Sequence, residues 1–124
     1  MPLRRVLIVD DEPYILRILA FKLRRAGYDA LEATCSEQAI EALCANRVHC
    51  IILDVTLASP TTGFRFAEEL RDDPRFCRIP VIFLTAHGLP ADRRRGEALG
   101  AAAYITKPFA LNDVLEAVAR LVPA

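Results

Sequence analysis

The chain has 124 residues, of which 53% are hydrophobic, and its 16 basic side chains balance its 16 acidic ones. A chain of this length suits one domain, residues 1–124, that buries roughly two thirds of its unfolded surface. Its apolar content excludes an intrinsically disordered protein. Because the net charge is zero, nothing draws the chain generally to nucleic acid or to an anionic membrane, and we expect neither as a direct partner.

The cysteines and the N-terminal residues indicate a cellular setting. Cys35, Cys44, Cys50 and Cys77 show no metal-ligand spacing, so we expect buried or half-buried free thiols. Only four apolar residues follow the basic N-terminal flank, fewer than a signal peptide needs. No run approaches the roughly 18 apolar residues of a membrane span. We therefore expect a soluble, cytoplasmic protein.

Short apolar runs alternate along the chain with longer amphipathic segments. The runs are predicted to be strands, at Val6–Val9, Tyr28–Ala33, Ile51–Leu53, Val81–Leu84 and Ala103–Thr106. Apart from Tyr28–Ala33, they are mostly β-branched, aromatic or Leu, which favours strand over helix. The first, third and fourth runs are apolar throughout, which is typical of parallel strands buried on both faces. The second alternates weakly and fits an edge strand.

Five helices are predicted between and after these strands. They cover Pro13–Ala26, Ser36 to about Ala45, Phe64–Arg71, Pro90–Leu99 and Asn112–Val122. Pro13 suits the first turn of its helix, Ser36 can cap the second, and Gly27 and Gly100 end the first and the fourth.

The helices carry apolar stripes that can cover a sheet. In the first helix the stripe is predicted to be Ile15, Ile18, Leu19 and Leu23, and in the fifth it is Val114, Leu115, Val118 and Leu121. Five strands alternating with five helices give a parallel sheet covered on both sides. Since crossovers are right-handed, the fold class is α/β, a three-layer doubly wound sandwich.

Polar residues follow the apolar strands where each strand ends. Asp10 and Asp11 follow the first, Asp54 the third, Thr85 the fourth and Lys107 the fifth. In open α/β sheets ligands bind in the crevice at the carboxyl ends of the strands. We therefore expect carboxylates, a hydroxyl and an amine to meet at one edge.

This set of groups suits phosphoryl chemistry. Clustered carboxylates attract a hard divalent cation such as Mg²⁺, while a lysine and a hydroxyl can hold a tetrahedral anion. An aspartate can itself act as the nucleophile and form an aspartyl phosphate. No GxxxxGK[ST] loop occurs, which argues against a bound nucleotide as the phosphate source.

Four motifs, in order and at these spacings, resemble the receiver domain of two-component response regulators. They are VDDEP at 9–13, ILDVTL at 52–57, LTA at 84–86 and GAAAYITKPF at 100–109. The resemblance covers essentially the whole chain. It implies a flavodoxin-like fold in which the strands have the order 2-1-3-4-5.

The resemblance also implies roles for individual residues, which we name by their numbers here. Asp54 matches the phosphoacceptor, Lys107 the lysine that pairs with the phosphoryl group, and Thr85 the switch hydroxyl. Tyr104 matches an aromatic switch that swings inward when Thr85 moves. Pro108 matches a position often preceded by a cis peptide bond.

The implied Mg²⁺ site consists of Asp10, Asp11, Asp54 and the backbone carbonyl of Thr56. Thr56 and His87 match positions that tune the reaction; His87 either biases the attacking water or only covers the site. Glu12 is interpreted mainly as an acidic residue at the N-terminus of a helix, where the helix dipole favours negative charge.

The sequence departs from the family pattern in two places. The family usually has Pro four residues and Gly eight residues after the acceptor. Here position 58 is Ala58, proline appears only at Pro60, and Gly63 is nine residues after Asp54, so we expect the loop after Asp54 to be one residue longer. Ala102 and Ala103 replace two acids common in transcription-factor receivers, which puts their salt-bridged dimer in doubt. Arg93–Arg95 are interpreted as a solvated helix face.

These observations lead to a functional hypothesis with two alternatives. The chain is expected to be a signalling switch that takes a phosphoryl group from a histidine kinase or phosphotransfer protein and remodels the surface of the fourth helix, fifth strand and fifth helix. It would catalyse only its own phosphorylation and slow autodephosphorylation. It would act on a downstream protein or fused output domain, as a monomer or a phosphorylation-dependent dimer. The alternatives are a phosphorylation-independent interaction module and an Asp-nucleophile phosphatase.

Overall fold

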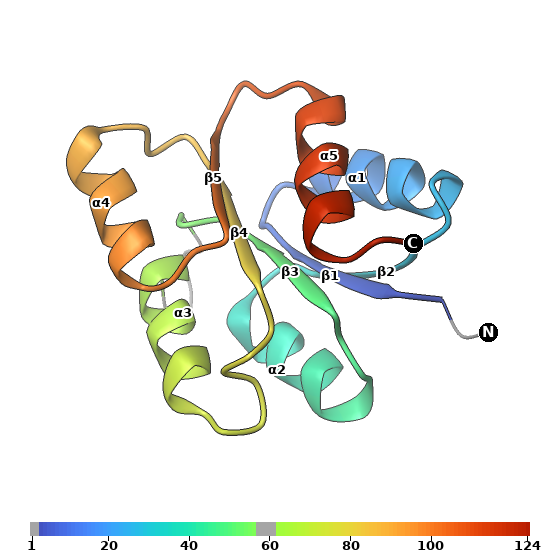
Figure 1. Cartoon of the computed structure of the whole chain (residues 1–124), viewed down its shortest axis with the longest axis horizontal. Helices are drawn as coiled ribbons and strands as arrows, with labels where there is room; N and C mark the ends of the chain where they lie inside the picture. Colours follow the sequence, from blue (N-terminus) through green and yellow to red (C-terminus); the bar gives the residue numbers. More distant parts are fainter. Residues whose placement is uncertain (1–2, 57–61) are drawn as a thin grey trace.

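The computed structural model describes residues 3–56 and 62–124 of the chain, in which strands and helices alternate from end to end (Figure 1). The strands are β1 (Arg5–Val9), β2 (Asp29–Ala33), β3 (Cys50–Leu53), β4 (Val81–Thr85) and β5 (Ala103–Thr106). The helices are α1 (Pro13–Arg25), α2 (Ser36–Ala45), α3 (Gly63–Asp72), α4 (Pro90–Ala98) and α5 (Leu111–Leu121). Every predicted element is present, with ends that shift by a residue or two.

All five strands pair in parallel, in the order β2-β1-β3-β4-β5. Helices α1 and α5 cover one face of the sheet, and α2 and α3 cover the other (Figure 1). This is the predicted three-layer doubly wound sandwich with the predicted strand order. The weakly alternating strand, β2, lies at an edge as expected.

The strand sequences explain why both faces are covered. Val6 and Ile8 of β1 pack into the core under α1 and α5, whereas Leu7 and Val9 pack into the core under α2 and α3. All four side chains are at most 1% exposed. Because neighbouring side chains in a strand point to opposite faces, a run that is apolar at every position can only be satisfied between two layers.

The apolar stripes of the outer helices were predicted only in part. In α1 the buried residues are Leu16, Leu19, Ala20 and Leu23, while Ile15 and Ile18 lie half-buried at the margin. In α5 the buried residues are Val114, Ala117 and Val118, whereas Leu115 is half-buried and Leu121 is 37% exposed. Each helix is rotated so that small alanines face the sheet, which periodicity of large residues alone does not reveal.

The helix ends follow the predicted glycines but not the predicted cap. Gly27 and Gly100 lie just beyond α1 and α4 with φ of 98° and 80°, the left-handed region that favours glycine. Ser36, however, is the first residue inside α2, and Cys35 takes the N-cap position without a side-chain bond. The turn is held instead by the Gln38 side chain, which accepts hydrogen bonds from the Thr34 backbone N–H and hydroxyl.

The four cysteines are free thiols, but two are more exposed than predicted. Cys50 is buried in the sheet and Cys35 is half-buried, whereas Cys44 and Cys77 are exposed. Both exposed cysteines lie outside the strands, near the ends of α2 and α3. Among the residues that the structure describes, no helix combines the length and apolar character that crossing a membrane requires.

Candidate phosphoryl-transfer site

The polar residues at the strand ends gather at one edge of the sheet. Asp10 follows β1, Asp54 follows β3, Thr85 ends β4, and Lys107 follows β5, and these four strands are adjacent. Asp10, Asp54 and Thr85 are 2%, 1% and 0% exposed. Buried carboxylates are costly unless they are paired or ligate a cation, so this cluster marks a site.

Lys107 holds the carboxylates together. Its Nζ lies 3.0 Å from Oδ2 of Asp10, 3.1 Å from Oδ2 of Asp54 and 3.4 Å from Oε1 of Glu12. Its side chain is only 14% exposed. The peptide bond between Lys107 and Pro108 is cis, as the resemblance led us to expect.

The second oxygen of each buried aspartate is held by a backbone turn. Oδ1 of Asp10 accepts a hydrogen bond from the Glu12 N–H at 2.9 Å, and Oδ1 of Asp54 accepts one from the Thr56 N–H at 3.0 Å. Each carboxylate is thus fixed both by its own loop and by Lys107. Groups held in this way react without first having to be ordered.

The charges in the cluster shift two pKa values. Burial alone would lower the pKa of Lys107, but hydrogen bonds to Asp10 and Asp54 outweigh it and raise that pKa above its ordinary value of 10.5. Burial raises the pKa of Asp10, since the hydrogen bonds from Glu12 and Lys107 compensate it only in part and Asp54 repels it. The site therefore has more negative charge than one ammonium neutralises.

The acids that follow β1 form a group able to hold a hard cation. Oxygens from Asp10, Asp11 and Glu12 lie within 4.8 Å of one another. Oxygen donors of this kind suit Mg²⁺. Glu12 occupies the N-cap position of α1 without making a capping bond, and its carboxylate turns to Lys107 instead. A role in starting helix α1 therefore does not explain where the Glu12 carboxylate lies.

The backbone of a single residue, His87, connects Thr85 with Tyr104. The backbone N–H of His87 donates to the Thr85 hydroxyl oxygen at 3.2 Å, and the backbone carbonyl of His87 accepts from the Tyr104 hydroxyl. The tyrosine ring is thus tied, through residue 87, to the hydroxyl at the end of β4. The His87 side chain itself is exposed.

The Tyr104 ring lies in a space that Gly96 of α4 leaves open. A Cβ at position 96 would lie 2.8 Å from the ring. Phe83 packs against the Tyr104 ring with centroids 5.8 Å apart, and the Arg93 guanidinium stacks over the ring at 5.3 Å. Arg95 stacks in the same way over Phe64, at 4.7 Å. Two of the three arginines predicted as a merely solvated face therefore cover aromatic rings.

Gly63, the first residue of α3, lies against the backbone of Asp54. A Cβ at position 63 would be 2.2 Å from the Asp54 carbonyl oxygen and 2.7 Å from the Val55 Cα. The Gly63 N–H donates to the Val55 carbonyl at 3.0 Å. Sequence reasoning noted this glycine only as a shifted family position and missed its contact. The remainder of the longer loop, with Ala58 and Pro60, lies outside the described residues.

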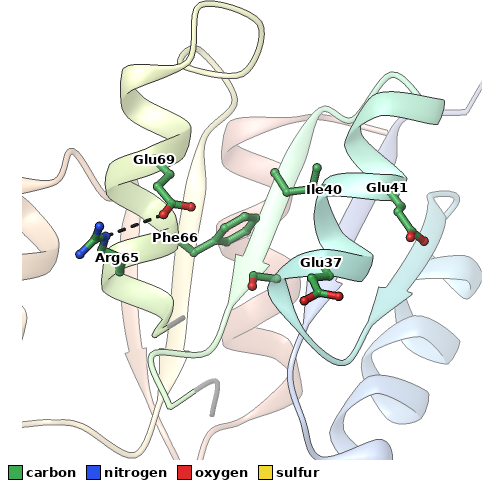
Figure 2. Close-up of a pocket in the computed structure, with 7 residues that line it drawn as sticks. Glu37, Ile40, Glu41, Arg65, Phe66 and Glu69 are labelled. Carbon is green, nitrogen blue, oxygen red and sulfur yellow. Dashed lines mark ion pairs between the residues drawn. The ribbon is translucent and has the colours of Figure 1, made fainter. Parts of the chain in front are cut away.

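A wide groove of about 720 Å³ lies between α2 and α3 (Figure 2). The side chains of Ile40 on α2 and Phe66 on α3 lie between the two helices. Glu37, Glu41, Arg65 and Glu69 also line the groove, and Arg65 pairs with Glu69 at 3.7 Å. The groove's ionisable side chains are all exposed, unlike the buried Asp10 and Asp54. We therefore take the strand-end cluster, rather than this groove, as the candidate site.

Comparison with known proteins decides the family. Residues 6–119 match the model of the response regulator receiver domain. The chain belongs to the response regulator receiver family. It is 40% identical over 118 residues to the phosphate regulon transcriptional regulatory protein PhoB of Pseudomonas aeruginosa, covering 95% of this chain and 50% of that protein. It is 39% identical to the transcriptional regulatory protein YvrH of Bacillus subtilis, covering 94% and 46%.

The solved receivers agree in fold. The chemotaxis response regulator CheY4 of Vibrio cholerae superposes with a TM-score of 0.87 at 29% identity, covering 97% of this chain and 99% of that one. The receiver chain spans about half the length of the curated regulators that it matches.

Proposed function

We propose that this chain is a phosphoacceptor switch of two-component signalling in which Asp54 takes up the phosphoryl group. The observation that carries the proposal is the position of Asp54: a buried carboxylate held by the Thr56 N–H and by Lys107, beside the equally buried Asp10. The donor would be the phosphohistidine of a histidine kinase or phosphotransfer protein.

The chemistry requires little of the protein beyond positioning and charge. A carboxylate oxygen of Asp54 attacks phosphorus while the P–N bond to the donor imidazole breaks, and the electron pair leaves with that imidazole. Lys107, already 3.1 Å from Asp54, neutralises charge on the transferring oxygens. Thr85, at the end of the adjacent strand, offers a hydroxyl to the acyl phosphate product.

The acidic group fits a magnesium ion. Asp10, Asp11 and Asp54 with the backbone carbonyl of Thr56 would hold it, and Glu12 stands at its margin. When bound, Mg²⁺ supplies positive charge beside the phosphoryl oxygens. The raised pKa of Asp10 supports this assignment, because burial and the neighbouring Asp54 make its charge costly without a further cation.

The switch would run from Thr85 to Tyr104. A phosphoryl group on Asp54 attracts the Thr85 hydroxyl, and the His87 backbone, hydrogen-bonded to both Thr85 and Tyr104, transmits the change to α4 and β5. A local change in charge thus biases a surface element. The surface of α4, β5 and α5 would meet a downstream protein or a fused output domain. The His87 side chain, exposed beside Thr85, would tune loss of the phosphoryl group.

The cellular location and the oligomeric state belong to the same proposal. We propose a cytoplasmic regulator, monomeric or dimerising on phosphorylation, with catalysis limited to its own phosphorylation and slow dephosphorylation. Ala102 and Ala103, at the start of β5, lack the carboxylates that salt bridges across an α4–β5 dimer would need. A dimer through that face would therefore depend on other contacts.

The test uses acetyl phosphate and Mg²⁺ with the full chain. Mass spectrometry is expected to show one added phosphoryl group in the unaltered protein and none in Asp54→Ala. Asp72→Ala, an exposed aspartate at the end of α3, is the matched control and should be phosphorylated normally. Equal phosphorylation of Asp54→Ala would contradict the proposal. No phosphorylation of any form would favour the interaction module, and steady hydrolysis of a phosphomonoester would favour the phosphatase.

A further inference from the structure

A second recess lies at the opposite end of the sheet from Asp54. It is about 410 Å³ in volume and lies where the segments after α2 and α3 lead into β3 and β4. Because β3 and β4 are parallel, the amino ends of both strands meet here, while the phosphoryl-transfer site lies at their carboxyl ends.

Arginines surround this recess, and its floor is apolar. Arg47, Arg75 and Arg78 are exposed at its rim, and none of the residues that line it is acidic. Phe76 and Val48 form part of the floor and are 7% and 6% exposed. The whole chain has no net charge, so three arginines around one recess concentrate positive charge in this region.

One rim arginine is held rigidly by a neighbouring acid. Arg75 makes a two-pronged pair with Asp73, through Nη2 at 2.8 Å and Nε at 3.1 Å, and stacks over Phe76 at 4.7 Å. Its charge is thereby largely compensated. Arg47 and Arg78 differ, since neither has an ion pair among residues 3–56 and 62–124.

His49 also lines the recess and adds a hydrogen-bond donor. Its Nδ1 accepts the Arg5 backbone N–H at 3.0 Å, which leaves the Nε2 proton for a ligand. Burial lowers the pKa of His49, and the positive charges of Arg4, Arg47 and Arg5 lower it further. Arg5 is itself paired with Asp29 at 2.7 Å. The electrostatic potential at the His49 ring is therefore positive.

From this arrangement we infer that the recess is a docking site for an acidic segment of a partner protein, with apolar side chains on the floor and carboxylates on Arg47, Arg78 and His49. Charge complementarity selects an anionic ligand. The apolar floor favours a peptide over the phosphate backbone of a nucleic acid, which offers no side chain to fill it. The inference goes beyond the proposed function, because this end of the sheet takes no part in phosphoryl transfer.

The test titrates the isotope-labelled full chain with a short synthetic peptide in which Asp and Glu alternate with Leu and Phe. NMR shifts are expected at residues 47–49 and 75–80. Arg47→Gln and Arg78→Gln should each weaken binding by about tenfold, the usual worth of a charge-assisted hydrogen bond. Lys22→Gln, an exposed cation on α1, is the matched control and should leave binding unchanged.

Further arms separate the alternatives. Asp54→Asn should bind the peptide as well as the unaltered chain, so loss of phosphorylation and loss of docking are distinguishable. Thermal unfolding should show that both arginine variants remain folded, since these side chains are exposed. Shifts elsewhere on the chain, equal weakening by Lys22→Gln, or tighter binding of random-sequence duplex DNA than of the peptide would each overturn the inference.

Discussion

Gly63 lies so close to Asp54 that a single added carbon at position 63 would be 2.2 Å from the Asp54 carbonyl oxygen. The first turn of α3 therefore rests directly on the backbone of the proposed phosphoacceptor. The Thr62 side chain, which accepts a hydrogen bond from the Arg65 N–H at 3.2 Å, fixes the start of that helix. The position of the reactive carboxylate thus depends on where α3 begins.

Gly63→Ala is expected to destabilise the chain by about 1–3 kcal/mol, because the new methyl group must displace backbone rather than a flexible side chain. It should also slow phosphorylation of Asp54 by moving the acceptor. Urea unfolding and the rate of phosphorylation by acetyl phosphate check both effects. Gly88→Ala is the control: its added carbon would meet only the Thr106 side chain, with Cγ2 at 3.1 Å and Cβ at 3.8 Å. Equal effects of the two substitutions would show that the contact with Asp54 is unimportant.

Lys107→Met is expected to lower the free energy of unfolding by about 3 kcal/mol near neutral pH without divalent cations, because it leaves Asp10 and Asp54 buried without a cationic partner. The folded-state pKa of Lys107 is raised above 10.5. Its stabilisation is therefore complete below that pH and lost as the pH rises above it.

Urea unfolding of Lys107→Met and the unaltered chain, at about pH 7 and then above pH 10.5, measures this contribution. The difference between them should shrink at the higher pH. Lys22→Met, which removes an exposed cation of α1, should change little at either pH. A difference that grows with pH would mean that Lys107 does not stabilise the carboxylates as an ammonium.

Asp11→Asn is expected to weaken Mg²⁺ binding by about tenfold or more, because it removes a full negative charge from a ligand oxygen. Glu12→Gln should have a much smaller effect, since the Glu12 carboxylate is 58% exposed and turned to Lys107. Calorimetric titration with Mg²⁺ compares the two. Equal losses of Mg²⁺ affinity in the two variants would mean that Glu12 is also a metal ligand.

The cysteines are expected to differ in how readily they react with an alkylating agent. Iodoacetamide is expected to modify the exposed Cys44 and Cys77 within the native protein, whereas Cys50 should react only on unfolding. Burial raises the pKa of the Cys50 thiol to about 12, so almost no thiolate forms under ordinary conditions. Mass spectrometry of the alkylated peptides shows the order in which the cysteines react. Early modification of Cys50 would mean that β3 opens readily.

The sequence predicted those features that depend on the order of residues along one element. Runs that are apolar at every position allowed only central parallel strands, and the residue after each strand had to lie at the same edge. Asp10, Asp54, Thr85 and Lys107 could therefore be assigned to one edge from the sequence alone. The contacts of Lys107 confirm that Asp10 and Asp54 meet it there, and Thr85 ends β4, which lies between β3 and β5.

Features that depend on how two elements approach each other were not predictable. Ala20 and Ala117 are buried because their helices lie close to the sheet, a fact that no period of large residues reveals. Stacking of Arg93 on Tyr104 needs the crossing of α4 with β5. The contact between Gly63 and Asp54 likewise joins positions on either side of a loop. Each miss was a tertiary contact that overrode a local pattern.

The link from Thr85 to Tyr104 passes through main-chain atoms of His87 alone. Every amino acid supplies that carbonyl, and every one except proline supplies the N–H. The side chain at position 87 can therefore change without loss of either hydrogen bond. If the proposed switch holds, substitutions at this one position would alter how long the phosphoryl group persists and leave the backbone connection to β5 intact.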